Sequence, residues 1–286
     1  MFGSRPRVAA SLVLAALVLP LRPVLASPGP ADSVRVLGGR PVTAGRYPFL
    51  VSLQRVEATG AAAHFCGGSL IGTVWILTAA HCLQGQSRTG VRVVVGATRL
   101  SAGDGQVRRP AEVHIHPAYD GDAAHGADVA LIRLSAPVEG ITPVKPVGLE
   151  ERDRWEPGDT ATVVGWGVTS EAGTIASDDL LAAPVPIEPD TVMTAADAYG
   201  DSFRPSDMVG AGPMKGGSDA CFGDSGGPLL VGRGSTLRQV GIVSFGLGCG
   251  RPGHPGVYSR LGEGRVRAFV DSLVLSPSST GVERRP

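Results

Sequence analysis

The sequence predicts an all-β fold, and three observations support this prediction. The 286 residues include 41 Gly and 23 Pro but only 5% aromatic residues, a composition typical of many turns that join short strands. Short apolar runs bounded by Gly, Pro, Asp or Ser recur along the chain, as strands do in sandwiches and barrels. A convincing helical pattern occurs in one place, near the C-terminus.

The expected strands form two sets, separated by residues 136–158, a stretch rich in Pro, Gly and charge that we interpret as the crossing between two halves. The first set of apolar runs covers residues 49–53, 69–71, 75–77, 91–95 and 129–134. The second set covers residues 161–164, 228–231, 239–243 and 256–258. After them, Val266, Phe269, Val270 and Leu273 share one helical face, which predicts a helix that packs against the second half.

The two ends of the chain differ from the rest. Residues 1–26 have a basic start, a short apolar core and small residues at Val24-Leu25-Ala26, the pattern of a cleaved export signal. A buried N-terminal helix is the alternative. Export would place the protein in an oxidising, extracellular compartment, where its four cysteines can pair. The polar residues 276–286 are expected to be a disordered tail.

Charge and composition exclude several classes of partner. The 26 basic and 26 acidic residues balance, which argues against a nucleic-acid partner, and no stretch of 18 apolar residues predicts a mature membrane span. The four cysteines include no C-x-x-C pair, so a cysteine metal site is not favoured. We expect a monomer that needs no cofactor.

A glycine-rich stretch carries the candidate nucleophile. In Gly223-Asp224-Ser225-Gly226-Gly227 the serine lies among glycines, which lets backbone and ligand atoms approach closely. An ordinary surface turn would give the same letters. So would the nucleophile elbow of α/β-hydrolases, but there the acid and the histidine follow the serine. Here the single downstream histidine, His254, lies in a loop rich in Gly and Pro.

The better partners lie upstream of the serine. His81 ends the run Thr78-Ala79-Ala80-His81, and Asp128 precedes the apolar run 129–134, which gives the order His, Asp, Ser. With these motifs, and with Val36-Leu37-Gly38-Gly39, the chain resembles the trypsin-like serine proteases over nearly all of its length after residue 35. The resemblance implies a chymotrypsin-like fold of two antiparallel six-stranded barrels with a short C-terminal helix, whereas the residue pattern alone supports only an all-β fold.

The resemblance implies a catalytic role for three side chains. Ser225 is a weak nucleophile until a base removes its proton, and neutral imidazole, with an ordinary pKa near 6.5, suits His81 for that task. Asp128 would orient the His81 ring and stabilise the imidazolium. Ser244 matches the position that donates a hydrogen bond to this aspartate, and the backbone N–H groups of Gly223 and Ser225 would form the oxyanion hole.

The resemblance also implies a cationic specificity. Asp219, six residues before Ser225, matches the base of the primary pocket, where a carboxylate favours Arg or Lys. Ala220 stands where some relatives have Ser, so we expect Arg to be preferred over Lys, because a guanidinium binds carboxylate in a bidentate fork. The substrate-binding residues expected from this match are Asp219, Ala220, Ser244, Phe245, Gly246 and Gly256.

Activation and cross-links are further implications of the resemblance. Cleavage after Arg35 would remove the propeptide 27–35 and free the amine of Val36, which would pair with Asp224. The implied disulfides are Cys66–Cys82 and Cys221–Cys249. The chain departs from many relatives at two places. It has Ala195 and Gly210 where a third disulfide would lie, so the segment 190–215 is expected to be looser. It also has Ala127 before Asp128, where Asn is frequent.

The sequence therefore predicts a secreted serine endopeptidase, with a protease domain at residues 36–275, made as a zymogen. It would cut protein or peptide substrates after Arg, and after Lys, through an acyl-enzyme. Protein protease inhibitors are further expected partners. The alternatives are a non-catalytic binding protein of the same fold and an esterase that uses the same three side chains.

Overall fold

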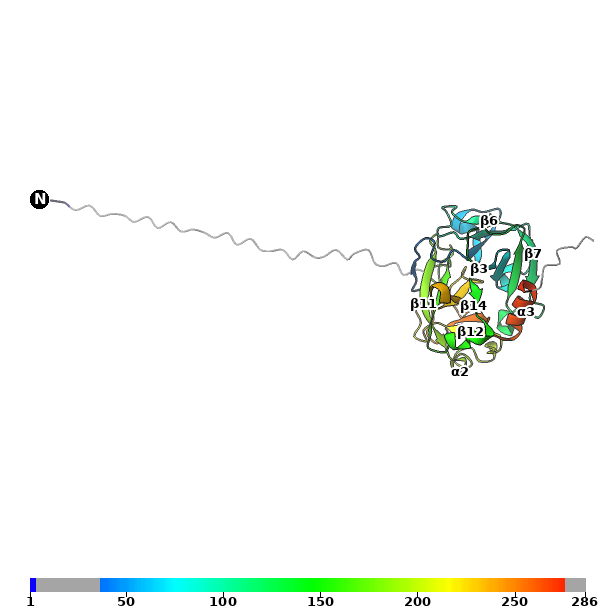
Figure 1. Cartoon of the computed structure of the whole chain (residues 1–286). Coiled ribbons are helices and arrows are strands. Elements are labelled where there is room, and N and C mark those ends of the chain that lie inside the picture. The colour runs from blue at the N-terminus through cyan, green and yellow to red at the C-terminus, as the bar shows by residue number, and fades with distance from the viewer. Residues whose placement is uncertain (4–36, 276–286) are drawn as a thin grey trace, which may run out of the picture. The chain divides into compact units, whose positions relative to one another are not determined.

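The chain after residue 36 is built mainly from antiparallel β-strands that form two sheets (Figure 1). The computed structural model describes residues 1–3 and 37–275, except for the side chains of residues 152–154. The expected export signal, the junction at Arg35 and Val36 and the tail 276–286 therefore lie outside the described residues. No helix among those described is both long and apolar enough to cross a membrane.

The first sheet follows the path β6-β5-β2-β3-β4-β8-β7. Its strands are β2 (Leu50–Arg55), β3 (His64–Gly72), β4 (Trp75–Thr78), β5 (Val91–Val95), β6 (Gln106–Arg108), β7 (Pro110–Ile115) and β8 (Ala130–Leu134). Arg109 alone separates β6 from β7, so one bent segment supplies both ends of the path. Because no ladder joins β6 to β7, this seven-stranded sheet forms a half-barrel rather than the closed six-stranded barrel that the resemblance implies.

The second sheet closes on itself. Its strands are β1 (Arg40–Pro41), β9 (Lys145–Pro146), β10 (Thr160–Gly165), β11 (Leu181–Glu188), β12 (Met208–Ala211), β13 (Pro228–Val231), β14 (Arg238–Phe245) and β15 (Gly256–Arg260). The order β11-β10-β13-β14-β15-β12, together with pairing of β11 with β12, makes a closed six-stranded barrel. Closure leaves only short stretches of these strands, such as residues 183–186 of β11, with an unpaired edge.

Helices are short, apart from the C-terminal one. They are α1 (Ala80–Leu83), α2 (Asp190–Met193), α3 (Gly264–Val274) and the 3-10 turns η1 (Gly60–Ala63), η2 (Ala123–His125), η3 (Leu149–Arg154), η4 (Gly200–Ser202) and η5 (Gly234–Thr236). In α3, Val266 and Val270 are buried in the main core, as the sequence pattern predicts. The ring of Phe269 lies 4.9 Å from that of His116, so α3 also contacts the first half (Figure 1).

A continuous apolar core explains why these strands form. Leu50, Leu53, Ile76, Trp166 and Leu181 have no exposed surface, and both sheets contribute to the same buried cluster. Burying one such aliphatic side chain contributes roughly 1.5–3 kcal/mol, so the interior favours the two-sheet arrangement strongly. Catalytic side chains placed on the loops of such sheets gain a rigid support.

The segment 190–215 replaces the absent third disulfide with packing. Met193 is fully buried among Tyr199, Phe203 and Met208. A Cβ atom added to Gly210 would lie 2.4 Å from the sulfur of Met193, so the methionine fills the space beside this glycine. Both expected disulfides, Cys66–Cys82 and Cys221–Cys249, are present, and no cysteine of the chain is free.

Candidate active site

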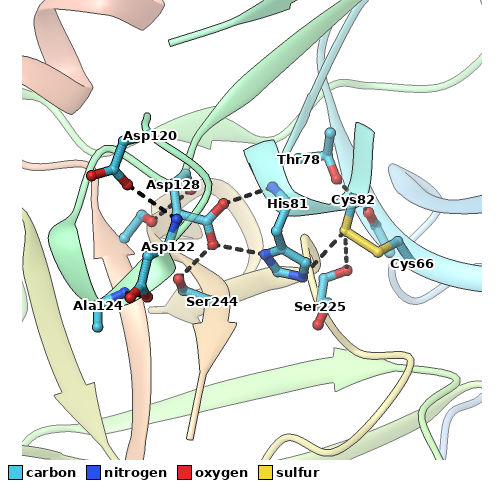
Figure 2. A network of polar contacts seen from close by, with 12 residues as sticks. Cys66, Thr78, His81, Cys82, Asp120, Asp122, Ala124, Asp128, Ser225 and Ser244 are labelled. Carbon is cyan, nitrogen blue, oxygen red and sulfur yellow. Dashed lines mark hydrogen bonds and ion pairs between the residues drawn. A yellow bond between two sulfur atoms is a disulfide. The ribbon is translucent and has the colours of Figure 1, made fainter. Parts of the chain in front are cut away.

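His81 and Asp128 are brought together by the ends of two elements. His81 lies in α1, directly after β4, and Asp128 lies two residues before β8, which pairs with β4. One carboxylate oxygen of Asp128 accepts the backbone N–H of His81 at 2.9 Å, and the other lies 2.8 Å from His81 Nδ1 (Figure 2). Because a carboxylate only accepts, Nδ1 carries the proton and Nε2 is left free to act as a base.

The environment of Asp128 keeps its carboxylate ionised. The side chain is almost fully buried, and the Ser244 hydroxyl donates to it at 2.6 Å. Burial on its own would raise the pKa of Asp128, but the hydrogen bonds from His81 and Ser244 and the charge of His81 outweigh it, and the pKa is lowered. The arrangement can stabilise a positive charge on the His81 ring.

Ser225 lies beside His81 at the N-terminal side of β13 (Figure 2). Within the described residues its hydroxyl makes no hydrogen bond to His81 Nε2, so the expected contact is not formed here. Such catalytic hydrogen bonds are often long before substrate binds. Cys82 Sγ lies 3.7 Å from Nε2. This sulfur belongs to the Cys66–Cys82 disulfide, so it is neither a donor nor a thiolate that could bind a metal.

The backbone around Gly223 exposes two amide groups. Gly223 has φ +96°, a conformation that side chains rarely adopt. The carbonyl of Phe222 accepts from Val168 N–H at 2.8 Å, which orients the peptide that carries the Gly223 N–H. Within the described chain, the N–H groups of Gly223 and Ser225 have no intramolecular acceptor. Both are therefore available to a substrate oxygen.

Asp224 is fully buried behind Ser225. Its two carboxylate oxygens accept backbone N–H groups of Cys221 at 2.9 Å and Gly167 at 2.8 Å. Burial raises the pKa of Asp224 to about 6, because these two bonds compensate only part of the desolvation of a charge. A Cβ atom on Gly165 would lie 2.2 Å from a carboxylate oxygen of Asp224, so a glycine is required there.

A cavity of about 210 Å³ opens next to Ser225. Every substrate-binding residue expected from the sequence lines it: Asp219, Ala220, Ser244, Phe245, Gly246 and Gly256. A Cβ atom on Gly256 would lie 2.6 Å from Asp219 Oδ1, so a larger residue would cover this carboxylate. The cavity thus combines an open lining beside Gly256 with a buried acidic group.

Asp219 supplies that acidic group. It is 1% exposed and accepts backbone N–H groups of Ala220 and Gly250, each at 2.8 Å. Burial is the main reason that the pKa of Asp219 is raised to about 7, and the charge of Asp224 adds to the shift. A carboxylate in such surroundings gains most from a cationic partner.

Two residues of the site were missed by sequence reasoning. The buried hydroxyl of Tyr258 has no hydrogen-bond partner within the described structure, and it lines the same cavity as Asp219. His64 is buried beneath Gly223, and its Nε2 lies 2.9 Å from the Gly223 carbonyl oxygen. Tyr258 could have been suspected because it lies in the expected strand 256–258, two residues after the substrate-binding residue Gly256. The sequence does not show that its hydroxyl lacks a hydrogen-bond partner. No local pattern marked His64.

Comparisons with known proteins agree with this geometry. The family model described as Trypsin matches residues 36–265. A protein named Trypsin from Saccharopolyspora erythraea is 41% identical over 241 residues, which cover 84% of this chain and 96% of the relative. Serine protease 56 from Mus musculus is 38% identical over 259 residues, which cover 88% of this chain and 40% of the relative. The chymotrypsin-like fold expected from the sequence is confirmed, and the chain belongs to the trypsin family of serine proteases.

Proposed function

We propose that this protein is a secreted endopeptidase that hydrolyses peptide bonds after Arg, and more slowly after Lys. One observation carries the proposal above all: a buried carboxylate, Asp219, ends a cavity whose mouth holds Ser225. A substrate whose cationic side chain reaches Asp219 would present its next carbonyl group to the serine. An apolar side chain in the same cavity would leave the Asp219 carboxylate without a counter-charge.

The contacts support an acyl-enzyme mechanism. His81 Nε2 takes the proton of Ser225 as its oxygen bonds to the carbonyl carbon, and the Gly223 and Ser225 amides stabilise the resulting oxyanion. The imidazolium, held by Asp128, then gives that proton to the leaving amine as the C–N bond breaks. Water, deprotonated by the same ring, displaces Ser225 from the acyl group and regenerates the enzyme.

The preference for Arg over Lys follows from the backbone N–H groups that already donate hydrogen bonds to the Asp219 carboxylate. Each carboxylate oxygen accepts one backbone N–H, and a guanidinium can add one N–H to each oxygen in a planar fork. An ammonium would need further acceptors for its remaining protons. Ala220 has no hydroxyl to offer, and the Tyr258 hydroxyl, which lines the same cavity, is the unpaired buried side-chain oxygen there.

Activation by cleavage after Arg35 is part of the proposal. Leu37, next to Val36, packs against the Cys221–Cys249 disulfide, and its carbonyl accepts the Asp219 N–H at 2.9 Å. The chain therefore enters the described structure close to the loop that carries Asp224. A Val36 ammonium released by cleavage would give the buried Asp224 carboxylate the positive partner that it lacks in the described residues.

Secretion is supported by the cross-links and by the sequence of the N-terminal segment. All four cysteines are paired in two disulfides, which persist in oxidising compartments. The basic and apolar pattern of residues 1–26 agrees with export. Finding the mature protein in the culture medium, with residues 1–26 removed, would test this part.

The central test compares peptide amides that end in Arg, Lys, Phe or Ala, before and after cleavage at Arg35. We expect turnover of the Arg and Lys amides by the cleaved protein only, with Arg the better substrate. Activity of the uncut chain equal to that of the cut chain would contradict the zymogen. Hydrolysis of esters without any amide would show an esterase, and no turnover of either would show a binding protein.

A further inference from the structure

Four consecutive hydrogen bonds connect the surface of the first barrel to Gly223. Arg92 Nε lies 2.9 Å from Gln54 Oε1, and Gln54 Nε2 lies 3.1 Å from Ser52 Oγ. Ser52 Oγ lies 2.8 Å from His64 Nδ1, and His64 Nε2 lies 2.9 Å from the Gly223 carbonyl oxygen. We call this set the donor chain. It crosses strands β5, β2 and β3 and ends in the loop that carries Ser225.

The two ends of the donor chain fix the direction of every bond in it. A guanidinium can only donate and a carbonyl oxygen can only accept. Gln54 must therefore turn its oxygen to Arg92 and its N–H to Ser52. His64 must carry its proton on Nε2, and Nδ1 accepts from the Ser52 hydroxyl. Burial lowers the pKa of His64 to about 4, so at neutral pH its ring has a single N–H to give.

The interior members of the donor chain are shielded from water. Ser52, Gln54 and His64 are 0%, 4% and 6% exposed, so water does not compete for their hydrogen bonds. Gln54 lies opposite Arg92 on β5 and opposite His64 on β3 in the strand register. A second bond, from Arg92 Nη2 to the Ala58 carbonyl at 2.6 Å, holds the guanidinium in place. Buried bonds that all point one way polarise one another and strengthen the last of them.

The last hydrogen bond, from His64 to the carbonyl oxygen of Gly223, acts on a glycine, which has no side chain to restrain its backbone. The peptide between Gly223 and Asp224 is held by its carbonyl, through His64, and by its N–H, which donates to the Cys221 carbonyl at 2.9 Å. Rotation of this peptide would turn the Gly223 backbone, whose own N–H faces the substrate in the proposed mechanism. Loss of one such oxyanion donor typically costs 10²–10³ in turnover, so a partial rotation is already costly.

We propose that Gln54 and Arg92 are positioning residues for catalysis, which act through Ser52 and His64 to hold the Gly223 amide in place. Neither side chain lines the substrate cavity. The inference rests on the proposed function, because it assigns a role to Gly223 that only acyl transfer requires. It predicts an effect on transition-state stabilisation rather than on binding of the cationic side chain.

The test uses Gln54→Glu, which keeps the shape of the side chain but reverses the donor chain. A carboxylate accepts from both Arg92 and Ser52, so the hydroxyl no longer donates to His64. In the neutral ring the proton then moves to Nδ1, and a bare Nε2 faces the Gly223 oxygen. Gln106→Glu is the matched control: Arg108 Nη2 donates to Gln106 Oε1 at 2.8 Å on β6, and no contact links this pair to His64 within the described residues.

In the cleaved enzyme at pH 8, we expect Gln54→Glu to lower kcat for a peptidyl-arginine amide about tenfold, which is less than the 10²–10³ typical of a donor that is lost altogether. Inhibition by a peptidyl-arginine aldehyde, which forms an oxyanion, should weaken by about the same factor. KM and the affinity for benzamidine, which reports on Asp219, should stay within about twofold. Gln106→Glu should leave all four quantities unchanged.

Two additional variants probe the exposed end of the donor chain. Arg92→Met should lower kcat and weaken the aldehyde less than Gln54→Glu does, and Arg92→Lys should restore part of the loss. Nitrogen-15 NMR should find the His64 proton on Nε2 in the wild-type protein and on Nδ1 in Gln54→Glu. If circular dichroism shows that Gln54→Glu does not fold, kcat and the aldehyde affinity of Arg92→Met test the inference instead.

Wild-type kcat and aldehyde affinity in the folded Gln54→Glu variant would overturn the inference, as would a wild-type His64 proton on Nδ1. An unchanged Arg92→Met would overturn it when the first variant does not fold. A wild-type enzyme that hydrolyses no arginyl amide would overturn the proposed function instead, and the position of the His64 proton would then still test the direction of the donor chain.

Discussion

At the scale of single residues, the two buried carboxylates near Ser225 are the least ordinary groups in the molecule. Asp219 and Asp224 are both fully enclosed, and burial is the main cause of the raised pKa of each. An ionised carboxylate in such a place needs a cation. In the proposed function each one receives a different cation: the substrate side chain for Asp219 and the Val36 ammonium for Asp224.

The raised pKa of Asp219 predicts how binding of a cation depends on pH. The folded value of about 7 means that the empty pocket is protonated below pH 7 and must lose a proton to bind benzamidinium. Affinity should therefore rise with pH and level off above about 8; at pH 5 it should be weaker by about a hundredfold, a factor of ten per pH unit. Calorimetric titration of the cleaved protein would measure this.

Benzamide, neutral and of the same shape, is the control for that titration, and its weak binding should not change with pH. A benzamidine affinity that is constant between pH 5 and pH 8 would mean that Asp219 is ionised throughout. The pKa of Asp219 in the empty pocket would then not be raised.

Most residues of the proposed site could be predicted from the sequence, but the contacts among them could not. The motifs around His81, Asp128 and Ser225 are local, and so is the spacing between Asp219 and Ser225. His64 could not be found, because its partners Ser52 and Gly223 are distant in the sequence and meet it only through strand pairing. The unpaired hydroxyl of Tyr258 could not be predicted either, because whether a buried hydroxyl finds a hydrogen-bond partner depends on the packing around it.

At the scale of elements, every expected apolar run overlaps a strand, but six strands lie outside the expected runs, and β11 is the longest of them. β11 carries Pro184 and Pro186, which weaken a strand pattern because proline cannot donate to the ladder. Between Ala183 and Pro186 the strand pairs with β10 and with no other strand described, so its other edge tolerates the missing N–H groups. Ala183, Val185 and Ile187 still alternate into the core.

The turn that leads into β8 holds the only non-glycine residue with positive φ in the described part of the chain. Ala127, where related proteases often have Asn, adopts φ +56° while 1% exposed. The left-handed region costs an alanine roughly 1–2 kcal/mol relative to glycine. The alanine at this position therefore introduces backbone strain immediately before Asp128.

Two matched substitutions isolate that strain. Ala127→Gly should change the free energy of unfolding by less than about 0.5 kcal/mol, because relief of strain offsets the lost methyl group and the added chain entropy. Ala130→Gly, in β8 and equally buried, should lower it by about 1–2 kcal/mol, since nothing is relieved there. Urea unfolding of both variants checks this, and equal losses would show that Ala127 is unstrained.

At the scale of the whole molecule, the residues proposed for catalysis come from both halves of the chain. His81 and Asp128 lie next to β4 and β8 of the first sheet, and Ser225, Ser244 and Asp219 belong to the second half of the chain. The closed second barrel and the curled first one hold the loops between them. Composition alone predicted only an all-β protein; the two-barrel arrangement required the resemblance, because nothing in the strand pattern specifies which strands pair.

Activation should change how stability depends on pH. The pKa of Asp224 is about 6 in the folded chain and 3.8 when unfolded, so the folded state binds the proton more tightly and the uncut chain loses stability as pH rises through this window. A shift of this size is worth about 3 kcal/mol at pH 7. Pairing with the Val36 ammonium after cleavage should remove most of that loss.

The Ser225→Ala chain, which cannot cut itself, allows cut and uncut forms to be compared directly. The free energy of unfolding of the cut form minus that of the uncut form should grow by about 3 kcal/mol between pH 4 and pH 7. Contributions of the side chains that both forms share cancel in this difference, and the new Val36 amine, with an ordinary pKa of about 8, stays charged over this range. The same difference at both pH values would argue against an ion pair at Asp224.

The central claim is that Ser225 becomes a nucleophile toward a carbonyl that follows a cationic residue, once the chain is cut after Arg35. Active-site titration with a chromogenic guanidinobenzoate ester tests it most directly. We expect a burst of about one equivalent of chromophore per cut chain, with the acyl group found on Ser225, and no burst from the uncut chain or from cut Ser225→Ala. A burst of the same size in cut Ser225→Ala, or the absence of any burst in the correctly folded cut protein, would contradict it.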